Sequence, residues 1–271
     1  MINNTVLLSF DTEEFDLPRE HGIDISLDEA VKVSTYGILK ILEILSKNQV
    51  KATFFCTSNF AENAVDLIKR IMDDGHEVAC HGCDHWLPAV TDPAKSKKII
   101  ESLFSIKCYG YRQPRMFPVD EEELFKNGYL YNSSLNPAFI PGRYMHLTTP
   151  RTCFMKNGLL QIPASVTPAC RIPLFWLSLH NFPQHLYNSL AYKVLKHDGY
   201  FTTYFHPWEF YGLKEHPEYK VPFIIKRNSG EAMCKRLDNL INMFKSKGAE
   251  FSTYTPFAIA KKVELESSIS R

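Results

Sequence analysis

Two histidines four residues apart, His81 and His85 in the segment HGCDH, have a spacing that could bring two imidazoles to one metal ion. On a helical turn, residues four apart lie on the same side, which would place both rings within reach of a single cation. Each ring could equally be satisfied by a backbone carbonyl near the end of a strand. The spacing alone therefore leaves both a metal site and a structural pair open.

An acidic cluster, SFDTEEFD, lies near the start of the chain and could supply a metal ligand or a proton acceptor. Asp11 and Glu13 follow an apolar run, where burial and neighbouring charges change the pKa of a carboxyl group. Glu14 and Asp16 are expected in a solvated loop or at a helix N-terminus, as is usual for a run of charges. Open catalytic zinc sites combine two histidines with one carboxylate, so one acid could bind a metal while another takes a proton from water.

Two other segments carry residues that could take part in the same chemistry. His206 lies in FHPWEF, where a lone histidine is more often structural, and Trp208 could be either a core residue or a platform for a sugar ring. Arg112, in GYRQP, could partner a buried carboxylate or lie exposed at the surface. A serine or cysteine nucleophile is disfavoured, because the sequence contains no G-x-S-x-G segment.

These residues need elements to position them, and strand-like runs alternate with helical patterns along the whole chain. The expected strands cover 5–10, 52–56, 77–80, 108–112, 129–131, 160–162, 200–205 and 250–254, and the expected helices 27–46, 61–72, 94–105, 121–127, 184–197, 231–247 and 256–265. The alternation predicts an α/β fold with a parallel sheet, either open or closed as a barrel, in one domain over residues 1–271. The sequence Lys-Asn-Gly at 156–158 predicts a small β-hairpin insertion near residues 150–163.

The carboxyl ends of parallel strands form the active-site face of such folds. Asp11, His81, Arg112 and His206 each end or directly follow an expected strand. We therefore expect four separate strands to deliver charged or imidazole side chains to one rim.

Composition excludes several classes of protein. Thirty-one Lys and Arg residues against 30 Asp and Glu residues give a net charge of +1, which disfavours binding to nucleic acid or another polyanion. No apolar stretch approaches the length of a membrane span. Seven cysteines without paired spacing, and a start that lacks the pattern of an export signal, predict a cytoplasmic location.

The ordered set SFDTEEFD, KATFF, CHGCDHW, GYRQP, YNSS, IPAS and YFHPWEF resembles the polysaccharide deacetylase family, carbohydrate esterase family four, along nearly the whole chain. The resemblance implies a distorted (β/α) barrel with about seven parallel strands. It also implies hydrolysis of an N-acetyl group from an amino sugar of a cell-surface polysaccharide or its precursor, by water that a divalent metal activates. Zinc is the first choice of metal, with cobalt, nickel and manganese as alternatives.

The resemblance assigns roles residue by residue. Asp11 matches the base, Arg112 the arginine that orients and tunes it, and His206 the acid that protonates the leaving amine. Tyr111 and Trp208 are candidates for flanking the acetyl methyl group or the sugar ring.

For the metal, the resemblance implies His81, His85 and one acid. Many members have adjacent aspartates, but Thr12 follows Asp11 here, so Glu13 is the expected ligand and Glu14 a rival. Arg115 and Asn132 depart from the residues usual in the family, which affects the expected substrate preference more than the chemistry.

Other functions remain open at this stage. One alternative is a hydrolase of another C–N bond, in a formamido sugar or a cyclic imide. A second is a catalytically silent relative that binds glycans, and a third is a structural domain that binds a protein partner. The residues expected at the rim favour the enzyme, because Asp11 and His206 are both present.

Overall fold

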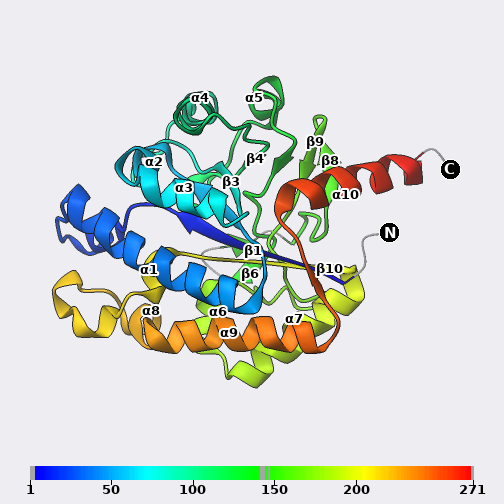
Figure 1. The fold of residues 1–271 in the computed structure, drawn as a ribbon. Helices are drawn as coiled ribbons and strands as arrows, with labels where there is room; N and C mark the ends of the chain where they lie inside the picture. The colour runs from blue at the N-terminus through cyan, green and yellow to red at the C-terminus, as the bar shows by residue number, and fades with distance from the viewer. Residues whose placement is uncertain (1–3, 141–143, 146, 270–271) are drawn as a thin grey trace.

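The computed structural model describes residues 4–140, 144–145 and 147–269, and a curled, mostly parallel sheet forms its centre (Figure 1). The strands run in the spatial order β10-β1-β2-β3-β4-β5-β9-β8, and β11 pairs with the start of β1. Their bounds are β1 Thr5–Thr12, β2 Thr53–Cys56, β3 Glu77–Cys80, β4 Gly110–Tyr111, β5 Tyr131–Asn132, β8 Phe154–Lys156, β9 Leu159–Gln161, β10 Tyr200–Phe205 and β11 Glu250–Phe251. A separate two-stranded sheet joins β6 Phe139–Ile140 to β7 Tyr144–Met145.

The sheet has the distorted barrel form that the sequence predicted. Every pairing within it is parallel except the hairpin of β8 and β9, which turns through Asn157 and Gly158, both at positive φ, as the Lys-Asn-Gly signal predicted. Between β9 and β10, hydrogen bonds from an irregular segment take the place of a ladder, since the backbone N–H of Ser165 donates to the carbonyl of Thr202. The barrel is distorted because this side is closed without a regular strand.

Helices cover the outside of the sheet, with α2 to α5 on one side of Figure 1 and α1, α7 and α9 on the other. Their bounds are α1 Leu27–Asn48, α2 Ser58–Asn63, α3 Val65–Asp73, α4 Asp92–Phe104, α5 Glu121–Lys126, α6 Trp176–Asn181, α7 Gln184–Asp198, α8 Phe223–Lys226, α9 Glu231–Ser246 and α10 Tyr254–Ile269. The predicted helix over 61–72 is instead two helices, because the backbone leaves the helical region at Ala64. The short helices α6 and α8 carry too few residues to give a periodic signal.

Helix α1 supports one of the predicted site segments directly. Its buried residues recur every three or four positions, as an amphipathic helix requires, and Ser26 caps its start by accepting the N–H of Glu29. At Gly37 the helix meets the turn η3, Pro207–Phe210, so closely that a Cβ atom would lie 1.8 Å from the Pro207 carbonyl oxygen. A glycine at this position therefore lets α1 hold the turn that follows His206.

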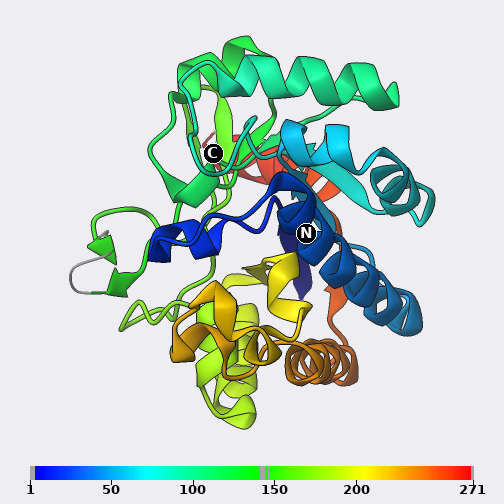
Figure 2. The same cartoon turned by 90° about the vertical axis from the view of Figure 1, so that its left-hand side faces the viewer.

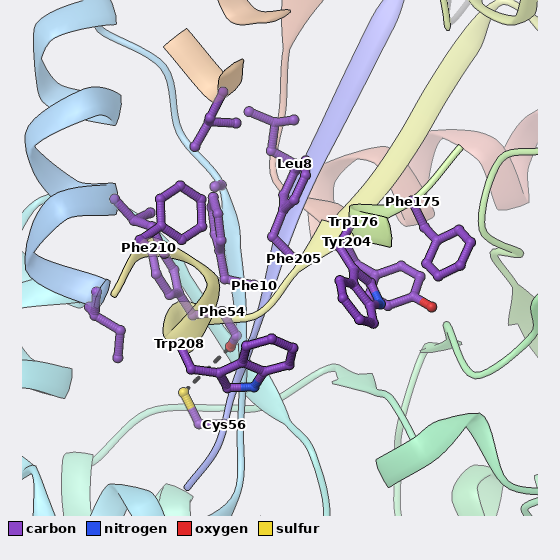
Figure 3. Close-up of a cluster of buried hydrophobic side chains, with 14 of the residues drawn as sticks. Leu8, Phe10, Phe54, Cys56, Phe175, Trp176, Tyr204, Phe205, Trp208 and Phe210 are labelled. Atoms are coloured by element: carbon purple, nitrogen blue, oxygen red, sulfur yellow. Dashed lines mark hydrogen bonds between the residues drawn. The ribbon is translucent and has the colours of Figure 1, made fainter. Parts of the chain in front are cut away.

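A cluster of buried aromatic side chains lies beneath the carboxyl ends of the strands (Figure 3). Phe10 stacks on Phe54 of the next strand with ring centroids 5.1 Å apart, and Phe205 lies 5.9 Å from Phe10 on the other side. Because side chains alternate along a strand, Phe10 faces this outer core while Asp11 faces the barrel interior. Packing of the aromatic layer thus fixes where the next residue points. Among the described residues, no helix is both long and apolar enough to cross a membrane.

Protonation of His76 is expected to weaken the fold in mild acid. The Nδ1 atom of His76 accepts the backbone N–H of Ala52 at 3.2 Å, and burial lowers the pKa of this histidine from 6.5 to about 4. Between those values the unfolded chain binds a proton that the folded chain does not, so the free energy of unfolding falls as the pH is lowered through this window. Urea titrations near neutral pH and near pH 4.5 measure how far the free energy of unfolding falls between the two conditions. This fall is expected to be about 2 kcal/mol smaller in His76→Asn than in the wild type. Equal losses in the two proteins would contradict the assignment.

Candidate metal and catalytic site

The predicted rim exists, at the face of the barrel that Figure 2 presents to the viewer. A cleft of about 370 Å³ opens there, lined among others by Asp11, Glu13, His81, His85 and His206. The strand ladders continue into the site, since the N–H of His81 donates to the Cys56 carbonyl at 2.8 Å. The carboxyl ends of β1, β3, β4 and β10 therefore bring together residues that are distant in the sequence.

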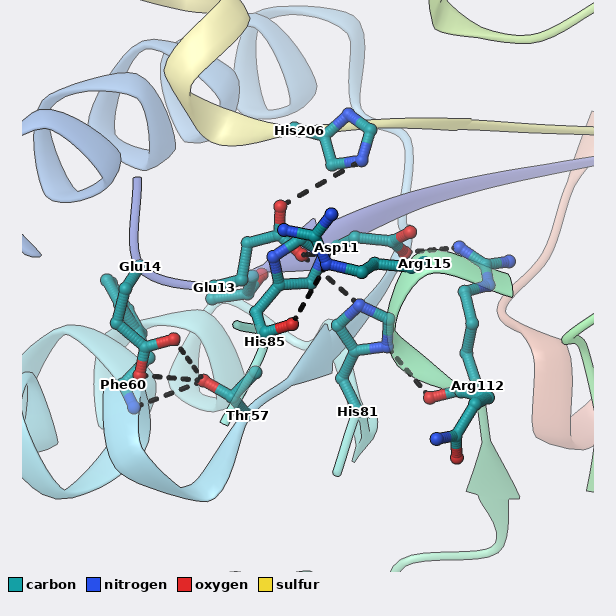
Figure 4. Close-up of polar contacts among 12 residues, drawn as sticks. Asp11, Glu13, Glu14, Thr57, Phe60, His81, His85, Arg112, Arg115 and His206 are labelled. Atoms are coloured by element: carbon teal, nitrogen blue, oxygen red, sulfur yellow. Dashed lines mark hydrogen bonds and ion pairs between the residues drawn. The ribbon is translucent and has the colours of Figure 1, made fainter. Parts of the chain in front are cut away.

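Glu13, His81 and His85 form a three-residue cluster whose ligand atoms lie within 4.8 Å of one another (Figure 4). The Nε2 atoms of both histidines are each 3.2 Å from Oε2 of Glu13. Burial raises the pKa of Glu13 well above its ordinary value, with Asp16 and Asp11 adding to the effect and His85 opposing it. Two imidazole nitrogens and one carboxylate oxygen converging on one point are a donor set that fits a divalent ion such as zinc.

Each imidazole is oriented through its other nitrogen. Nδ1 of His81 lies 2.8 Å from the Arg112 carbonyl oxygen, and Nδ1 of His85 lies 2.8 Å from Oδ2 of Asp16. Such outer contacts set the tautomer, so we assign the proton to Nδ1 and the free lone pair to Nε2 in both rings. Arg115 in turn holds Asp16 at 3.5 Å and donates to Glu20 at 2.6 Å. Asp16 precedes the 3-10 helix Leu17–His21 as its N-cap, which is one of the two predicted positions, but it is buried and not solvated, and it contacts the metal cluster through His85.

A loop, and not a helical turn, brings the two histidines together, which corrects the sequence interpretation. Gly82 adopts φ +73°, outside the right-handed helical region, so the chain turns directly after His81. The carbonyls of Gly82 and Cys83 accept the backbone N–H groups of Ser58 and Asn59 at the start of α2, at 3.0 Å each. The rings nevertheless stack with centroids 5.9 Å apart, because the loop is fixed by the helix next to it.

Glu14, the rival ligand, points away from the cluster. Its carboxylate accepts the Thr57 hydroxyl at 3.2 Å, and it lines a second, smaller cavity of about 180 Å³ that shares Asp16 with the cleft. Like Asp16, Glu14 is buried, whereas the sequence predicted that it would be solvated. The open choice between Glu13 and Glu14 is therefore decided by the direction in which the strand end turns.

Arg112 and Asp11 form a buried ion pair inside the barrel. Burial by itself raises the pKa of Asp11, but the Arg112 guanidinium, His81 and His206 outweigh this and hold the pKa below its ordinary value. Asp11 is therefore an ionised carboxylate at neutral pH. It lies beside the metal cluster but outside the set of residues whose ligand atoms converge.

His206 follows β10 and reaches the cleft from the opposite side to His81. Its Nδ1 lies 3.0 Å from Oε1 of Glu209, and its Nε2 faces Oε1 of Glu13 at 4.0 Å. Glu209 also accepts the backbone N–H of His206, and its other oxygen lies 3.0 Å from Nε2 of the buried His180. Burial lowers the pKa of His206 to about 3, although Asp11 favours its charged form. The imidazole in this site is thus neutral until it receives a proton.

Sequence reasoning missed Glu209 and His180, which hold His206 in place. A signal for Glu209 was available, because a Glu three residues after the N-cap position, here His206 directly before Pro207, is the pattern of a capping box. His180 carries no comparable pattern, and only the docking of α6 brings it to Glu209.

The two aromatic residues predicted to contact substrate lie in different places, one in the cleft and the other in the core. Trp208 lines the cleft, where its ring stacks on His206 with centroids 4.8 Å apart and its Nε1–H points to Oε1 of Glu13 at 3.4 Å. Tyr111 is fully buried in the core and donates its hydroxyl to Gln113 at 2.7 Å, so the structure does not place it against a substrate. Side chains alternate along an extended chain, and the side that faces the barrel interior is taken by Arg112, directly after β4. Trp176 also lines the cleft and lies edge-on to His206.

Comparisons with known proteins show a sequence family and a fold that this chain resembles. Residues 4–118 match the family model described as polysaccharide deacetylase. Among curated proteins, a peptidoglycan deacetylase of Helicobacter pylori is 32% identical over 108 residues, which is 36% of this chain and 37% of that protein. An uncharacterised Bacillus subtilis protein is 52% identical over 46 residues, or 17% of this chain and 14% of that protein. The chain thus matches well under two thirds of the length of these relatives.

The fold is shared with solved structures over most of their length. A probable polysaccharide deacetylase from Pseudomonas aeruginosa superposes with a TM-score of 0.67 at 15% identity, covering 94% of this chain and 89% of that one. A polysaccharide deacetylase from Mycobacterium smegmatis, itself described as putative, gives 0.66 at 16% identity, with 97% and 92% covered. An allantoinase gives 0.64 at 15% identity, with 94% and 88% covered. At these identities the likeness concerns the fold alone.

The family model spans the segments that carry Asp11, Glu13, His81, His85 and Arg112, and the fold of the solved relatives extends over the rest of the described chain. Residues 4–118 are therefore similar in sequence to the polysaccharide deacetylase family, and the described chain shares its fold with solved structures of that description.

Proposed function

We propose that this protein is a metal-dependent hydrolase that removes an N-acetyl group from an amino sugar of a cell-surface polysaccharide or its precursor. The observation that carries the proposal is the meeting, in one cleft, of a nitrogen and oxygen ligand cluster, an ionised buried carboxylate and an imidazole on the opposite wall. Deacetylation of an amide needs these three kinds of group: one to polarise the carbonyl, one to accept a proton from water, and one to return a proton to nitrogen.

Glu13, His81 and His85 would hold the metal, with zinc as the first choice because two histidines and one carboxylate are a frequent set for catalytic zinc. When bound, a divalent ion there would supply Lewis acidity toward the acetyl carbonyl and toward water.

Asp11 is the proton acceptor in this proposal. Its carboxylate is kept ionised by the Arg112 guanidinium, which also fixes its direction in the barrel interior. A base with a lowered pKa is weak, but it is present in its active form over a wide range of pH. The burial of the pair excludes bulk water, which would otherwise compete for the same hydrogen bonds.

His206 is the proton donor to the departing amine. Its Nδ1 is held by Glu209, so Nε2 is the atom presented to the cleft. Because the imidazole is neutral in the resting site, the proton it donates has to be taken up during turnover, and the proton that Asp11 removes from water is a nearby source. Glu209 stabilises the imidazolium while it carries that proton.

An amino sugar suits the walls of the cleft. Trp176, Tyr204 and Trp208 line one side, and Met116 and Phe117 line another, so the apolar faces of a sugar ring and an acetyl methyl group would meet apolar surface. The matched relatives include a peptidoglycan deacetylase, which supports a cell-wall or surface glycan as the class of substrate.

We also propose that the protein works in the cytoplasm. All seven cysteines are free, and Cys80 and Cys108 are both buried. Free cysteines in this number support a reducing compartment.

The resemblance of the fold to an allantoinase keeps hydrolysis of a cyclic C–N bond as a second candidate. It requires the same three groups, so product analysis separates it from deacetylation. Release of acetate from an N-acetylated sugar supports the proposal, whereas release of formate or opening of an imide ring supports the alternative.

The metal assignment is tested by zinc content and affinity. Wild type is expected to bind about one equivalent, His81→Ala and Glu13→Gln to lose it, and Asp16→Asn to bind about 10- to 100-fold more weakly because His85 loses its orienting partner. Glu14→Gln is the matched control, since Gln can still accept the Thr57 hydroxyl and lies outside the cluster. Loss of zinc in Glu14→Gln together with retention in Glu13→Gln would refute the ligand assignment.

The reaction is tested by acetate release from N-acetylated amino sugars with zinc-loaded protein. Asp11→Asn is expected to lower kcat by about 10²- to 10⁴-fold, because the amide cannot accept the proton from water. His206→Gln is expected to lower kcat to a similar degree, and both variants should keep their zinc because neither residue belongs to the cluster. Near-normal acetate release by Asp11→Asn would exclude the proposed role of the carboxylate.

Glu209 is expected to act on the rate through His206. Glu209→Gln retains an oxygen that can accept the His206 backbone N–H but can no longer supply a carboxylate beside Nδ1, so kcat should fall about 10-fold or more while KM changes little. A purely structural role would instead lower the unfolding free energy and leave kcat of the folded fraction unchanged. Measuring both quantities on the same variant distinguishes the two roles.

A further inference from the structure

Exposed apolar side chains gather around the mouth of the cleft. Among the large apolar residues that the structure describes, the three most exposed are Val90 at 86%, Leu87 at 74% and Phe223 at 69%. Leu87 and Val90 lie in the loop that follows β3 and contains His85, and Ile224, exposed at 51%, follows Phe223 in α8. Both segments also contribute to the lining of the cleft, the first through His85 and the second through Ile225.

Helix α8 lies on the outside of the molecule beside α6 (Figure 1). Its N–H groups at Ile225 and Lys226 both donate to the Pro222 carbonyl, and the Ile224 carbonyl accepts the Asn181 amide of α6 at 2.9 Å. Ile225 points into the cleft and lines it, while Phe223 and Ile224 are left outside. The turn thus presents an aromatic and an aliphatic side chain directly beside the opening.

Positive charge surrounds this pair. The segment KVPFIIKR at 220–227 contains Lys220, Lys226 and Arg227 and has no acidic residue. The Arg227 guanidinium lies 5.9 Å from the centroid of the Phe223 ring, so positive charge and apolar surface lie side by side in the segment 220–227. Exposed aromatic and aliphatic side chains flanked by Lys and Arg are the combination that enters the interface of an anionic membrane.

We propose that the segment 220–227, together with Leu87 and Val90, docks the cleft onto the surface of a membrane that contains anionic lipid. A flat lipid surface can receive both of these segments at the same time. Docking in this way would point the cleft toward sugars carried at the membrane surface, which extends the proposed function to a membrane-associated substrate. The docking itself is measured without any substrate, so it is tested independently of that function.

The test is co-sedimentation of the full chain with vesicles, either phosphatidylcholine alone or equal parts phosphatidylcholine and phosphatidylglycerol. Wild type is expected to bind the mixed vesicles, and Phe223→Ser/Ile224→Ser to bind them about 10-fold more weakly. Lys226→Gln/Arg227→Gln is expected to show a similar loss on mixed vesicles, with added salt weakening wild type in the same way.

The matched control is Ile259→Ser/Val263→Ser on α10, an apolar pair exposed at 54% and 59% on a different element. It should bind like wild type. Absence of wild-type binding to mixed vesicles, or equal losses in the control and the Phe223/Ile224 variant, would overturn the proposal. Zinc content and circular dichroism of each variant show that it is folded. Acetate release from a soluble sugar should be unchanged in Phe223→Ser/Ile224→Ser; if wild type releases no acetate yet binds vesicles, the enzymatic proposal fails and the docking surface stands.

Discussion

The buried guanidinium of Arg112 is the interaction on which the interior of the barrel depends. It pairs with Asp11 and donates to Ser9 and Tyr254, and its Nε donates to the carbonyl of Ser133 at 3.1 Å. These partners come from β1, from the segment after β5 and from α10, so one side chain links the two halves of the sheet. Its Cζ also lies 4.0 Å from the centroid of the Phe55 ring. A buried arginine is tolerated only when its donors are satisfied in this way, and removing one charged partner of such a pair commonly costs about 3–5 kcal/mol.

The same ion pair separates the roles of two acids that are close in the sequence. Asp11 is compensated by a permanent cation and stays ionised, whereas burial raises the pKa of Glu13 in the absence of such a partner. A divalent ion held by Glu13 and the two histidines would supply the missing positive charge. The contrast between the two carboxylates therefore explains why one suits proton transfer and the other suits metal binding.

Orientation in this site comes from contacts one step removed from the chemistry. Asp16 orients His85, the Arg112 carbonyl orients His81, and Glu209 orients His206. Rings that are fixed through one nitrogen present the other nitrogen in a defined direction, which lowers the reorganisation needed when a ligand or proton arrives. The packing of α1 through Gly37 onto η3 extends this support to the outer layer of helices.

Much of the fold and of the site could be predicted from the sequence, for identifiable reasons. The run Thr5–Phe10 is apolar without alternation because its strand is covered on both faces, and residues placed directly after such strands must reach the same rim. That rule was enough to bring together Asp11, His81, Arg112 and His206. The hairpin at Asn157 and Gly158 could also be predicted, because the type of a turn depends on the residues within it.

Other features depended on contacts between distant segments, which local patterns do not encode. The burial of Glu14 and Asp16, the exclusion of Tyr111 from the cleft and the pairing of Glu209 with His180 all follow from how loops and helices pack around the strand ends. The sequence by itself determined which chemical groups stand at the end of each strand, because periodicity and strand ends are local properties. Only the tertiary structure decided which of these groups face the cleft and what charge each one meets there, because direction and electrostatic environment arise from packing between residues far apart in the chain.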